Sequence, residues 1–377
     1  EMPLARIQRD GKKTNEKARY LSVYDGLARV EVETASAGDI IAIAGLDGIA
    51  IGDTLADSKN PVALPTIDVE EPTVRMTFGI NTSPFSGKEG KFVTSRQLRT
   101  RLYNELRSNV ALRVEETDSP DSFAVSGRGE LHLGILIETM RREGFELEVS
   151  RPEVILKEVD GKMLEPYEEV FIEVPAEVVG AVVEMLGKRK AEMKGMEEQA
   201  DGQTRLTYIV PTRGLLGFRH NFMTATRGNG VINSVFAHYG PRAGIISSRS
   251  KDSLVSHETG TTTPFSLKSA ETRGVLFVGP AIDVYAGMVV GEHQRAGDLD
   301  VNVTKKKHLD NMRTSFKSID NRLTPPRNMS LDECIEYLAD DELLEVTPEN
   351  LRIRKRMLSK SERAKALKQA KKAAESR

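Results

Sequence analysis

Apolar and polar residues alternate in the first part of the chain, with the period of two that is typical of half-buried β-strands. The clearest example is residues 27–34, and a strand-like run begins as early as residue 4. Gly-containing breaks such as Asp47-Gly48 separate these runs, and no helical pattern interrupts them. Closely spaced short strands predict a small β-barrel over residues 1–68. Because the barrel starts so abruptly, we interpret it as an N-terminally truncated part of a longer parent protein.

A linker with prolines follows, and the apolar spacing then changes to that of alternating strands and helices. Apolar residues recur every three or four positions in 94–109 and again in 130–142, which predicts two amphipathic helices. Strands are predicted at 73–80, 111–117, 122–126 and 145–150. The resulting order βαββαβ is the ferredoxin-like arrangement, and we assign it to residues 69–155 as the first repeat.

The same order of elements recurs in residues 160–241, the second repeat. Strands are predicted at 168–174, 191–199, 204–210 and 231–238, with one helix carrying Val179 to Leu186 and another near 215–226. The two repeats show no strong residue-by-residue identity. The repetition is therefore one of architecture.

The pattern weakens beyond residue 242. Residues 242–304 are rich in Gly, Ser and Thr, with strand-like runs at 275–278 and 298–303. We expect a loop over 305–327, a short helix at 331–339 and a frayed helical tail at 361–375. The predicted fold class is α+β multidomain: a small β-barrel, two ferredoxin-like domains and a mostly β C-terminal domain, 242–377, with short helices.

Composition favours a soluble protein of several domains. The chain has 377 residues, 54 Lys and Arg against 56 Asp and Glu, and one Cys. No apolar run approaches the length of a membrane span, and the N-terminus lacks the apolar stretch of a signal peptide. A single Cys excludes an intramolecular disulfide. These features predict a cytoplasmic location and no membrane association.

The net charge of −2 hides a strong local separation of charge. Residues 352–377 hold eleven Lys and Arg against two Glu, whereas 331–351 hold eight acidic residues and no basic one. Residues 301–330 are again basic, with seven Lys and Arg against two Asp. Because binding depends on local potential, near neutrality does not exclude a polyanionic partner.

The common enzyme motifs are absent. Ser86-Gly87-Lys88-Glu89 lacks the hydroxyl of a phosphate-binding loop, and His257-Glu258 is followed by Thr261 where a zinc-binding helix needs His. We find no dinucleotide fingerprint, no nucleophile elbow and no pair of His or Cys at metal-ligand spacing. The sequence therefore predicts no catalysis, no metal and no cofactor for this chain.

Three basic segments are candidates for contact with nucleic-acid phosphates, because Lys and Arg displace condensed counterions without reading bases. Each has a simpler explanation: a solvated surface loop for the first, a disordered terminus for the second, and a tight strand-to-helix turn for the third. The candidate residues are Lys305, Lys306, Lys307, His308, Arg313, Lys317, Arg322 and Arg327 in the loop, Arg352, Arg354, Lys355 and Arg356 at the start of the tail, and Arg213, Arg219 and Arg227 around Gly-rich turns.

Several motifs resemble those of a known family. Residues 126–137, Ser-Gly-Arg-Gly-Glu-Leu-His-Leu-Gly-Ile-Leu-Ile, resemble the third domain of elongation factor G, and residues 165–190 resemble the start of its fifth domain. Residues 37–55 are similar to the second-domain barrel of these factors. The segments 213–219, 284–293, 298–302, 340–348 and 352–356 resemble the BipA/TypA family of translational GTPases.

This resemblance implies the ribosome-binding portion of a GTPase whose GTP- and Mg-binding domain is absent here, so that GTP hydrolysis belongs to the parent protein. It implies large-subunit rRNA and the acceptor end of the A-site tRNA as partners of a monomer, and a role in ribosome assembly and in stress or virulence adaptation. The loop matching 305–323 would contact the tRNA, but residues 315–322 depart from the family pattern.

Two other functions stay open from the residues alone. One is a protein–protein scaffold that docks a partner through the acidic segment 331–351 and the basic tail. The other is an enzyme with an unrecognised site, which would need carboxylates or His to converge in a pocket.

Overall fold

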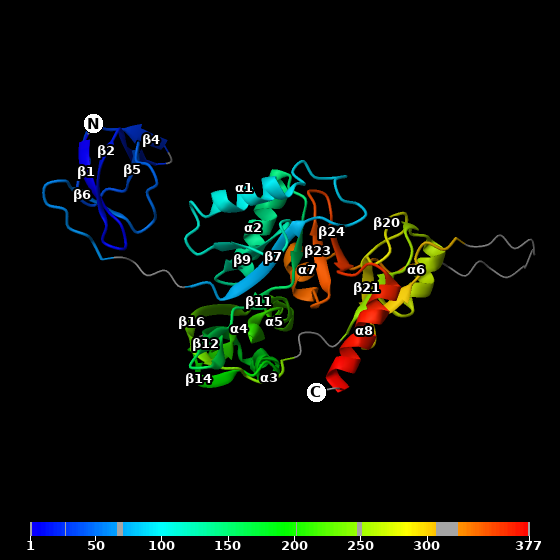
Figure 1. Ribbon diagram of the computed structural model, residues 1–377. Helices are drawn as coiled ribbons and strands as arrows, with labels where there is room; N and C mark the ends of the chain where they lie inside the picture. The colour runs from blue at the N-terminus through cyan, green and yellow to red at the C-terminus, as the bar shows by residue number, and fades with distance from the viewer. Residues whose placement is uncertain are drawn as a thin grey trace, which may run out of the picture. The chain divides into compact units, whose positions relative to one another are not determined.

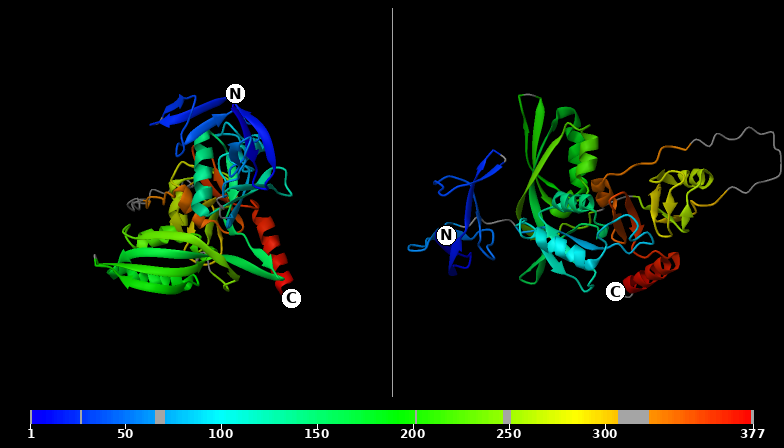
Figure 2. Two further views of the ribbon diagram at one scale, coloured as in Figure 1. Left: turned by 90° about the vertical axis from the view of Figure 1, so that its left-hand side faces the viewer. Right: turned by 90° about the horizontal axis from the view of Figure 1, so that it is seen from above.

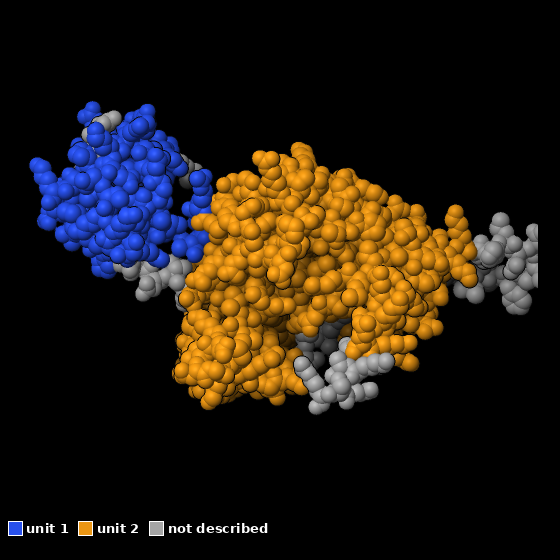
Figure 3. Space-filling view, viewed as in Figure 1, with its two compact units in different colours: residues 1–70, 107–110 blue, residues 71–106, 111–377 orange. Residues whose placement is uncertain are grey.

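The computed structural model describes residues 2–26, 28–65, 71–200, 202–246, 251–306 and 323–375. The chain forms two compact units (Figure 3). The first unit is Glu1–Glu70 with Arg107–Val110, and the second is Glu71–Leu106 with Ala111–Arg377.

The first unit is built of short antiparallel strands. They are β1 (Met2–Ile7), β2 (Lys13–Ala18), β3 (Tyr20–Asp25), β4 (Ala28–Glu31), β5 (Ile41–Ala44) and β6 (Thr54–Asp57). Two three-stranded sheets result, in the orders β2-β1-β6 and β4-β3-β5. The predicted β content is observed in this unit, and closure into a barrel stays a prediction.

The first repeat begins the second unit and has the predicted order of elements. These are β7 (Val74–Ile80), α1 (Ser95–Glu105), β8 (Arg113–Glu116), β9 (Ser122–Gly127), α2 (Glu130–Glu143) and β10 (Leu147–Ser150), and the sheet order β10-β7-β9-β8 is ferredoxin-like. A capping box between Thr94 and Gln97 starts α1. Helix α2 ends at Gly144, whose φ of 99° is one that glycine adopts without strain. Both helices lie beside the sheet (Figure 1), and their buried apolar residues share one cluster with those of the strands.

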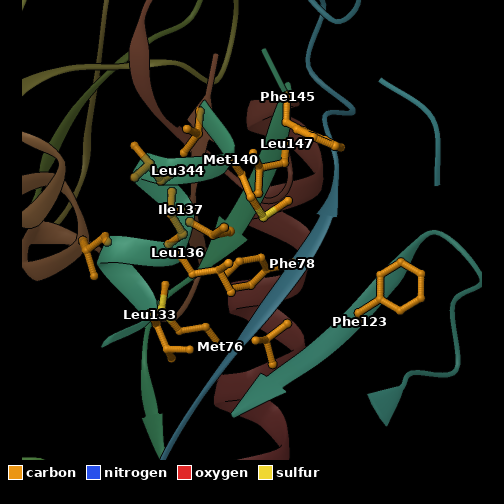
Figure 4. Close-up of a cluster of buried hydrophobic side chains, with 14 of the residues drawn as sticks. Met76, Phe78, Phe123, Leu133, Leu136, Ile137, Met140, Phe145, Leu147 and Leu344 are labelled. Atoms are coloured by element: carbon orange, nitrogen blue, oxygen red, sulfur yellow. The ribbon is translucent and has the colours of Figure 1, made fainter. Parts of the chain in front are cut away.

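The end of the chain completes this sheet. Strands β23 (Glu342–Val346) and β24 (Leu351–Lys355) form a hairpin, and β23 pairs antiparallel with β10, with Leu147 opposite Val346. Leu344 of β23 lies in the same buried cluster as Leu133 and Ile137 of α2 (Figure 4). Helix α7 (Leu331–Tyr337), which was predicted, adds Cys334 and Ile335 to that cluster.

The predicted division at residue 242 therefore does not separate the C-terminal segment from the first repeat. Residues 352–355, which we expected in a basic tail, are part of strand β24. The physical reason is that β10 would otherwise be an unpaired edge strand, and the hairpin covers that edge.

The second repeat has the same strand order and longer strands (Figure 2). Its elements are β13 (Lys162–Pro175), the 3₁₀ turn η1 (Ala176–Val178), α3 (Val179–Lys188), β14 (Glu192–Glu198), β15 (Gln203–Pro211), α4 (Thr212–Leu215), α5 (Arg219–Ala225) and β16 (Val231–Pro241). The helix predicted near 215–226 is thus two helices. The chain breaks between them because Leu216 is extended, with ψ of 125°, and Gly217 has a φ of 64°. Short strands β11 (Glu153–Val154) and β12 (Lys157–Val159) connect the repeats.

The remaining residues form a small β structure with its own core. It contains β17 (Ser253–Ser256), β18 (Gly260–Thr261), α6 (Pro264–Glu271), β19 (Gly274–Leu276), β20 (Asp283–Val284), β21 (Val289–His293) and β22 (Leu299–Val301). Leu254, Leu267, Tyr285 and Val290 are buried at its centre.

The tail forms helix α8 (Lys360–Glu375), and its first turn is not frayed. Arg363 pairs with Asp300 of β22 and donates to the carbonyl oxygen of Leu358, at 2.7 Å. In the part of the chain that the structure describes, no helix is long and apolar enough to cross a membrane.

Candidate nucleic-acid interface

The structure describes only the ends of the predicted basic loop. Lys307, His308, Arg313, Lys317 and Arg322 lie outside the described residues. At the start of the loop, Lys305 and Lys306 are exposed. Arg327, the last residue of the predicted loop, pairs with Glu292 at 3.4 Å and with Glu333 at 3.7 Å. Arg327 thus holds the end of the loop against β21 and α7.

Three predicted contacts at the C-terminus are internal. Arg352 pairs with Glu345 at 3.0 Å and with Glu89, and Arg354 pairs with Glu148. Lys355 lies 3.0 Å from carboxylate oxygens of both Asp341 and Glu342 and also pairs with Asp298. Arg354 is 2% exposed and Lys355 1%. Because these cations are buried and already neutralised, we remove Arg352, Arg354 and Lys355 from the candidate phosphate contacts.

Glu345 is the centre of this buried polar network. It is 0% exposed, and it accepts hydrogen bonds from Tyr285 Oη at 2.7 Å and from Asn81 Nδ2 at 3.0 Å in addition to Arg352. Burial, followed by the Glu345 carboxylate, raises the pKa of Tyr285. The network joins strand β24, the loop after β7 and the small β structure, so its role is to hold these three parts together.

Lys355 stays charged in spite of its burial. Burial alone would lower the pKa of its ammonium group, but the carboxylates of Glu342 and Asp298 outweigh that effect and raise the pKa. Glu342 is itself 0% exposed and also accepts from Ser253 Oγ at 2.7 Å. Two carboxylates of the acidic segment 331–351, Glu342 and Glu345, are thus inside the fold, whereas Asp332, Asp340, Asp341 and Glu349 stay exposed, and the scaffold hypothesis stays open.

Arg213, at the start of α4, connects two segments of the second repeat through its guanidinium group. Its guanidinium lies 3.0 Å from a carboxylate oxygen of Glu165, which is 0% exposed, and it donates to the carbonyl oxygen of Gly244 at 3.0 Å. Arg213 thus ties the start of β13 to the segment after β16. These contacts agree with the structural explanation of Arg213, in which it fixes a tight turn.

Arg219 and Arg227 point to solvent. Both are exposed, and neither side chain has a hydrogen-bond or ion-pair partner among the residues that the structure describes. Arg227 follows helix α5 with a φ of 52°, a left-handed conformation that glycine usually occupies. The N–H of Gly228 donates back to Met223 at 2.8 Å, which closes the helix end.

The two Gly-rich motifs of the sequence meet at the start of α2. Glu130 accepts a hydrogen bond from the N–H of Gly217 at 3.2 Å. Its other oxygen, Oε1, is buried without a hydrogen-bond partner in the described part of the chain. Burial raises the pKa of Glu130 to about 7, the N–H of Gly217 opposes this, and the carboxylates of Glu336 and Asp332 add to it. The sequence pointed to both motifs separately, but it gave no sign that they touch.

Five predicted contacts remain accessible, and we call them the exposed basic set: Lys305, Lys306, Arg219, Arg227 and Arg356. All five are exposed at their positions in the second unit. Side chains of this kind can neutralise phosphates with little dependence on base sequence. In the described ranges, no group of three or more His, Cys, Asp and Glu side chains could hold a metal ion.

Sequence reasoning missed one arginine beside the Arg213 turn. Arg189 follows α3 and donates to the carbonyl oxygens of Gly214, Leu216 and Gly217, at 2.7, 2.8 and 2.9 Å. Its guanidinium thereby satisfies the carbonyls at the end of α4. The available signal was the run Lys188-Arg189-Lys190 at the end of a predicted helix.

Two family models match consecutive parts of the chain. Residues 162–249 match the elongation factor G C-terminus, and residues 251–360 match the TypA/BipA C-terminal domain. The first match covers the second repeat. The second match begins just before β17 and ends at the start of α8.

Several curated proteins named large ribosomal subunit assembly factor BipA are similar to nearly the whole chain. The protein from Bacillus subtilis (strain 168) is 48% identical over 363 residues, which are 96% of this chain and 59% of that protein. The one from Synechocystis sp. is 49% identical over 351 residues, with 93% and 59% covered. The one from Escherichia coli (strain K12) is 50% identical over 361 residues, with 96% and 60% covered. The chain thus spans about three fifths of the length of these relatives.

Proposed function

This chain belongs to the BipA/TypA family, and we propose that it is the ribosome-binding portion of a translational GTPase that acts in assembly of the large subunit. The observation that carries the proposal is the identity of 48–50% to relatives named as assembly factors, over 93–96% of the chain. We further propose a cytoplasmic monomer that docks near the A-site tRNA acceptor end and serves in stress or virulence adaptation.

The proposed mechanism is docking through phosphate contacts. The exposed basic set supports it, since these cations have no internal carboxylate partners among the described residues. The chain contains 12 Phe, 8 Tyr and no Trp, which favours recognition of RNA shape and phosphates over base stacking. GTP and magnesium would be held by a part of the parent protein that this sequence does not include, so we expect no GTP hydrolysis by this chain alone.

Co-sedimentation with purified large subunits over a salt series tests this proposal. We expect binding whose logarithm falls linearly with the logarithm of salt concentration, because bound cations release counterions. The variant Lys305→Ala/Lys306→Ala should weaken binding and reduce the slope by roughly one to two units. Its melting temperature should stay unchanged, because exposed charges contribute little to folding.

The matched control is Arg273→Ala/Arg295→Ala, which removes the same charge from two exposed arginines outside the exposed basic set. Equal weakening by both double variants would show that only net charge matters. Absence of co-sedimentation at every salt concentration would contradict the proposed function.

A further inference from the structure

The topology of the second repeat brings three arginines to one end of its sheet. Strands β15 and β16 both run antiparallel to β13, and α3 runs back along the sheet after β13. The ends of α3, β15 and β16 therefore all lie beside the start of β13. Arg189 and Arg242 directly follow the ends of α3 and β16, and Arg213 lies two residues after the end of β15, in α4.

These arginines line a pocket of about 470 Å³, and a fourth joins them from the first repeat. The fourth is Arg151, which directly follows β10. The pocket also contains two acidic side chains, Glu153 and Asp340. Because its arginines come from both repeats, the pocket exists only when the two repeats are folded together.

Two of the four guanidinium groups have carboxylate partners. Arg213 is paired with the buried Glu165, as described above. Arg151 lies 2.7 Å from Asp340, but that carboxylate is 86% exposed, and an exposed pair of this kind contributes little and separates readily.

The other two guanidinium groups have no ion pair in the described residues, although the carboxylates of Glu336 and Glu130 lie near enough to Arg189 to favour its charged form. Arg189 donates only to backbone carbonyl oxygens and has no ion-pair partner within the described residues. Arg242 is exposed, and its side chain has no partner in the same part of the chain. The pocket thus holds more positive charge than its own carboxylates neutralise.

We infer that this four-arginine pocket is a binding site for a phosphate group. The planar guanidinium fork matches the oxygens of phosphate, and arginine is the residue best suited to such recognition. Arg189 and Arg213 are held in place by the backbone and by Glu165, so half of the site is formed before the ligand arrives. Arg151 and Arg242, being less constrained, would close on the phosphate.

Two sources could supply this phosphate: a free phosphate compound, or the backbone of RNA. The alternative in which RNA supplies the phosphate rests on the proposed ribosome binding, whereas the alternative of a free phosphate compound does not. The variant Arg151→Ala/Arg242→Ala tests both alternatives. We expect it to fold, because neither arginine has a buried partner in the described residues. The variant Arg273→Ala/Arg295→Ala again controls for the lost charge.

The first experiment is a calorimetric titration of the full chain with sodium pyrophosphate at low salt. If a free phosphate compound is the ligand, we expect one saturable site that weakens at least tenfold in Arg151→Ala/Arg242→Ala and less than twofold in the control. Asp340→Asn should change affinity in the opposite direction, a several-fold gain, because it frees Arg151 from its only ion-pair partner in the described residues.

The second experiment is co-sedimentation of the chain with large ribosomal subunits at a fixed, moderate salt concentration. If an RNA phosphate is the ligand, pyrophosphate does not bind, and the pocket variant loses at least tenfold in subunit affinity while the control loses much less. Absence of pyrophosphate binding combined with equal losses in the two double variants overturns the inference. If the chain does not bind subunits at all, the proposed function fails, and the pyrophosphate titration alone decides the pocket.

Discussion

The two βαββαβ repeats share a strand order but use their basic residues in opposite ways. In the first repeat, Arg354 and Lys355 arrive on a hairpin from the end of the chain and are buried in ion pairs. In the second repeat, Arg219, Arg227 and Arg242 stay exposed without partners in the described residues. The cations of the added hairpin therefore stabilise the first repeat, whereas these three arginines of the second repeat remain free to bind a ligand.

The difference follows from whether a strand from outside the repeat pairs with the edge of its sheet. The β10 edge of the first repeat is covered by β23 and β24, which brings their charges close to Glu148 and Glu345. In the second repeat the outer strands are its own, and Arg219, Arg227 and Arg242 lie at or just after the ends of helices and strands instead. Charges on the added strand are structural, whereas charges at the ends of elements are accessible at Arg219, Arg227 and Arg242 and engaged internally at Arg189 and Arg213.

The largest expected effect is on a buried cation of the first repeat. Arg354→Ala should lower the free energy of unfolding by about 3–5 kcal/mol, because it leaves Glu148 without its partner at a largely buried site. Urea unfolding measures this change. Arg356→Ala, two residues on and exposed, is the control and should stay within about 0.5 kcal/mol of the parent protein. Similar values for the two variants would mean that the ion pairs of β24 do not stabilise the fold.

A smaller effect concerns the contact between the two repeats at Glu130. Its pKa is raised from 4.5 to about 7, so the folded state binds the proton more tightly than the unfolded state does. The resulting stability is fully present below pH 4.5 and is lost as pH rises through about 7. Glu130→Gln, which imitates the protonated acid, should therefore gain up to about 3 kcal/mol relative to the parent protein between pH 5 and pH 8.

Urea unfolding at the two pH values provides the measurement. Glu336, whose pKa is also raised by burial, is present in both proteins, so the difference between them isolates Glu130. A gap that stays constant with pH would show that Glu130 is ionised throughout this range.

The smallest effect is expected at an exposed cation of the second repeat. Arg227 has a φ of 52°, which costs about 1 kcal/mol for a residue with a side chain. Arg227→Gly should leave thermal stability unchanged or raise it by up to about 1 kcal/mol, while large-subunit binding weakens. A clear loss of stability would place Arg227 among the structural cations, and the contrast between the repeats would then weaken.

Much of both repeats could be predicted from the sequence because their signals are local. The apolar stripe of α2 and the alternation in β9 each lie within about a dozen residues. The pairing of β23 with β10 joins segments about 190 residues apart, and nothing in Leu147–Ser150 indicates which strand covers its edge. Without that pairing, Arg352 to Arg356 could only be interpreted as part of a basic tail.

The candidate site was predictable to a lesser degree for a related reason. Whether a cation is free depends on the carboxylates around it, and those of Arg213 and Lys355 come from distant positions, Glu165 and Glu342. Arg189 was missed because its role is to bind carbonyl oxygens, which every residue carries. Arg219 and Arg227 are exposed, as a phosphate contact requires, because they lie at the start and just after the end of a short helix.

The hairpin at the end of the chain also sets an order of events during synthesis. Strand β10 leaves the ribosome about 190 residues before β23, an interval of roughly 10–40 s at typical translation rates. Throughout that interval the edge of β10 and the apolar surface that Leu344 later covers are without their partner strand. The second repeat contains all four of its core strands and can fold in the meantime. The second repeat can therefore complete its fold before the first repeat, whose sheet receives its last two strands only when the end of the chain has been synthesised.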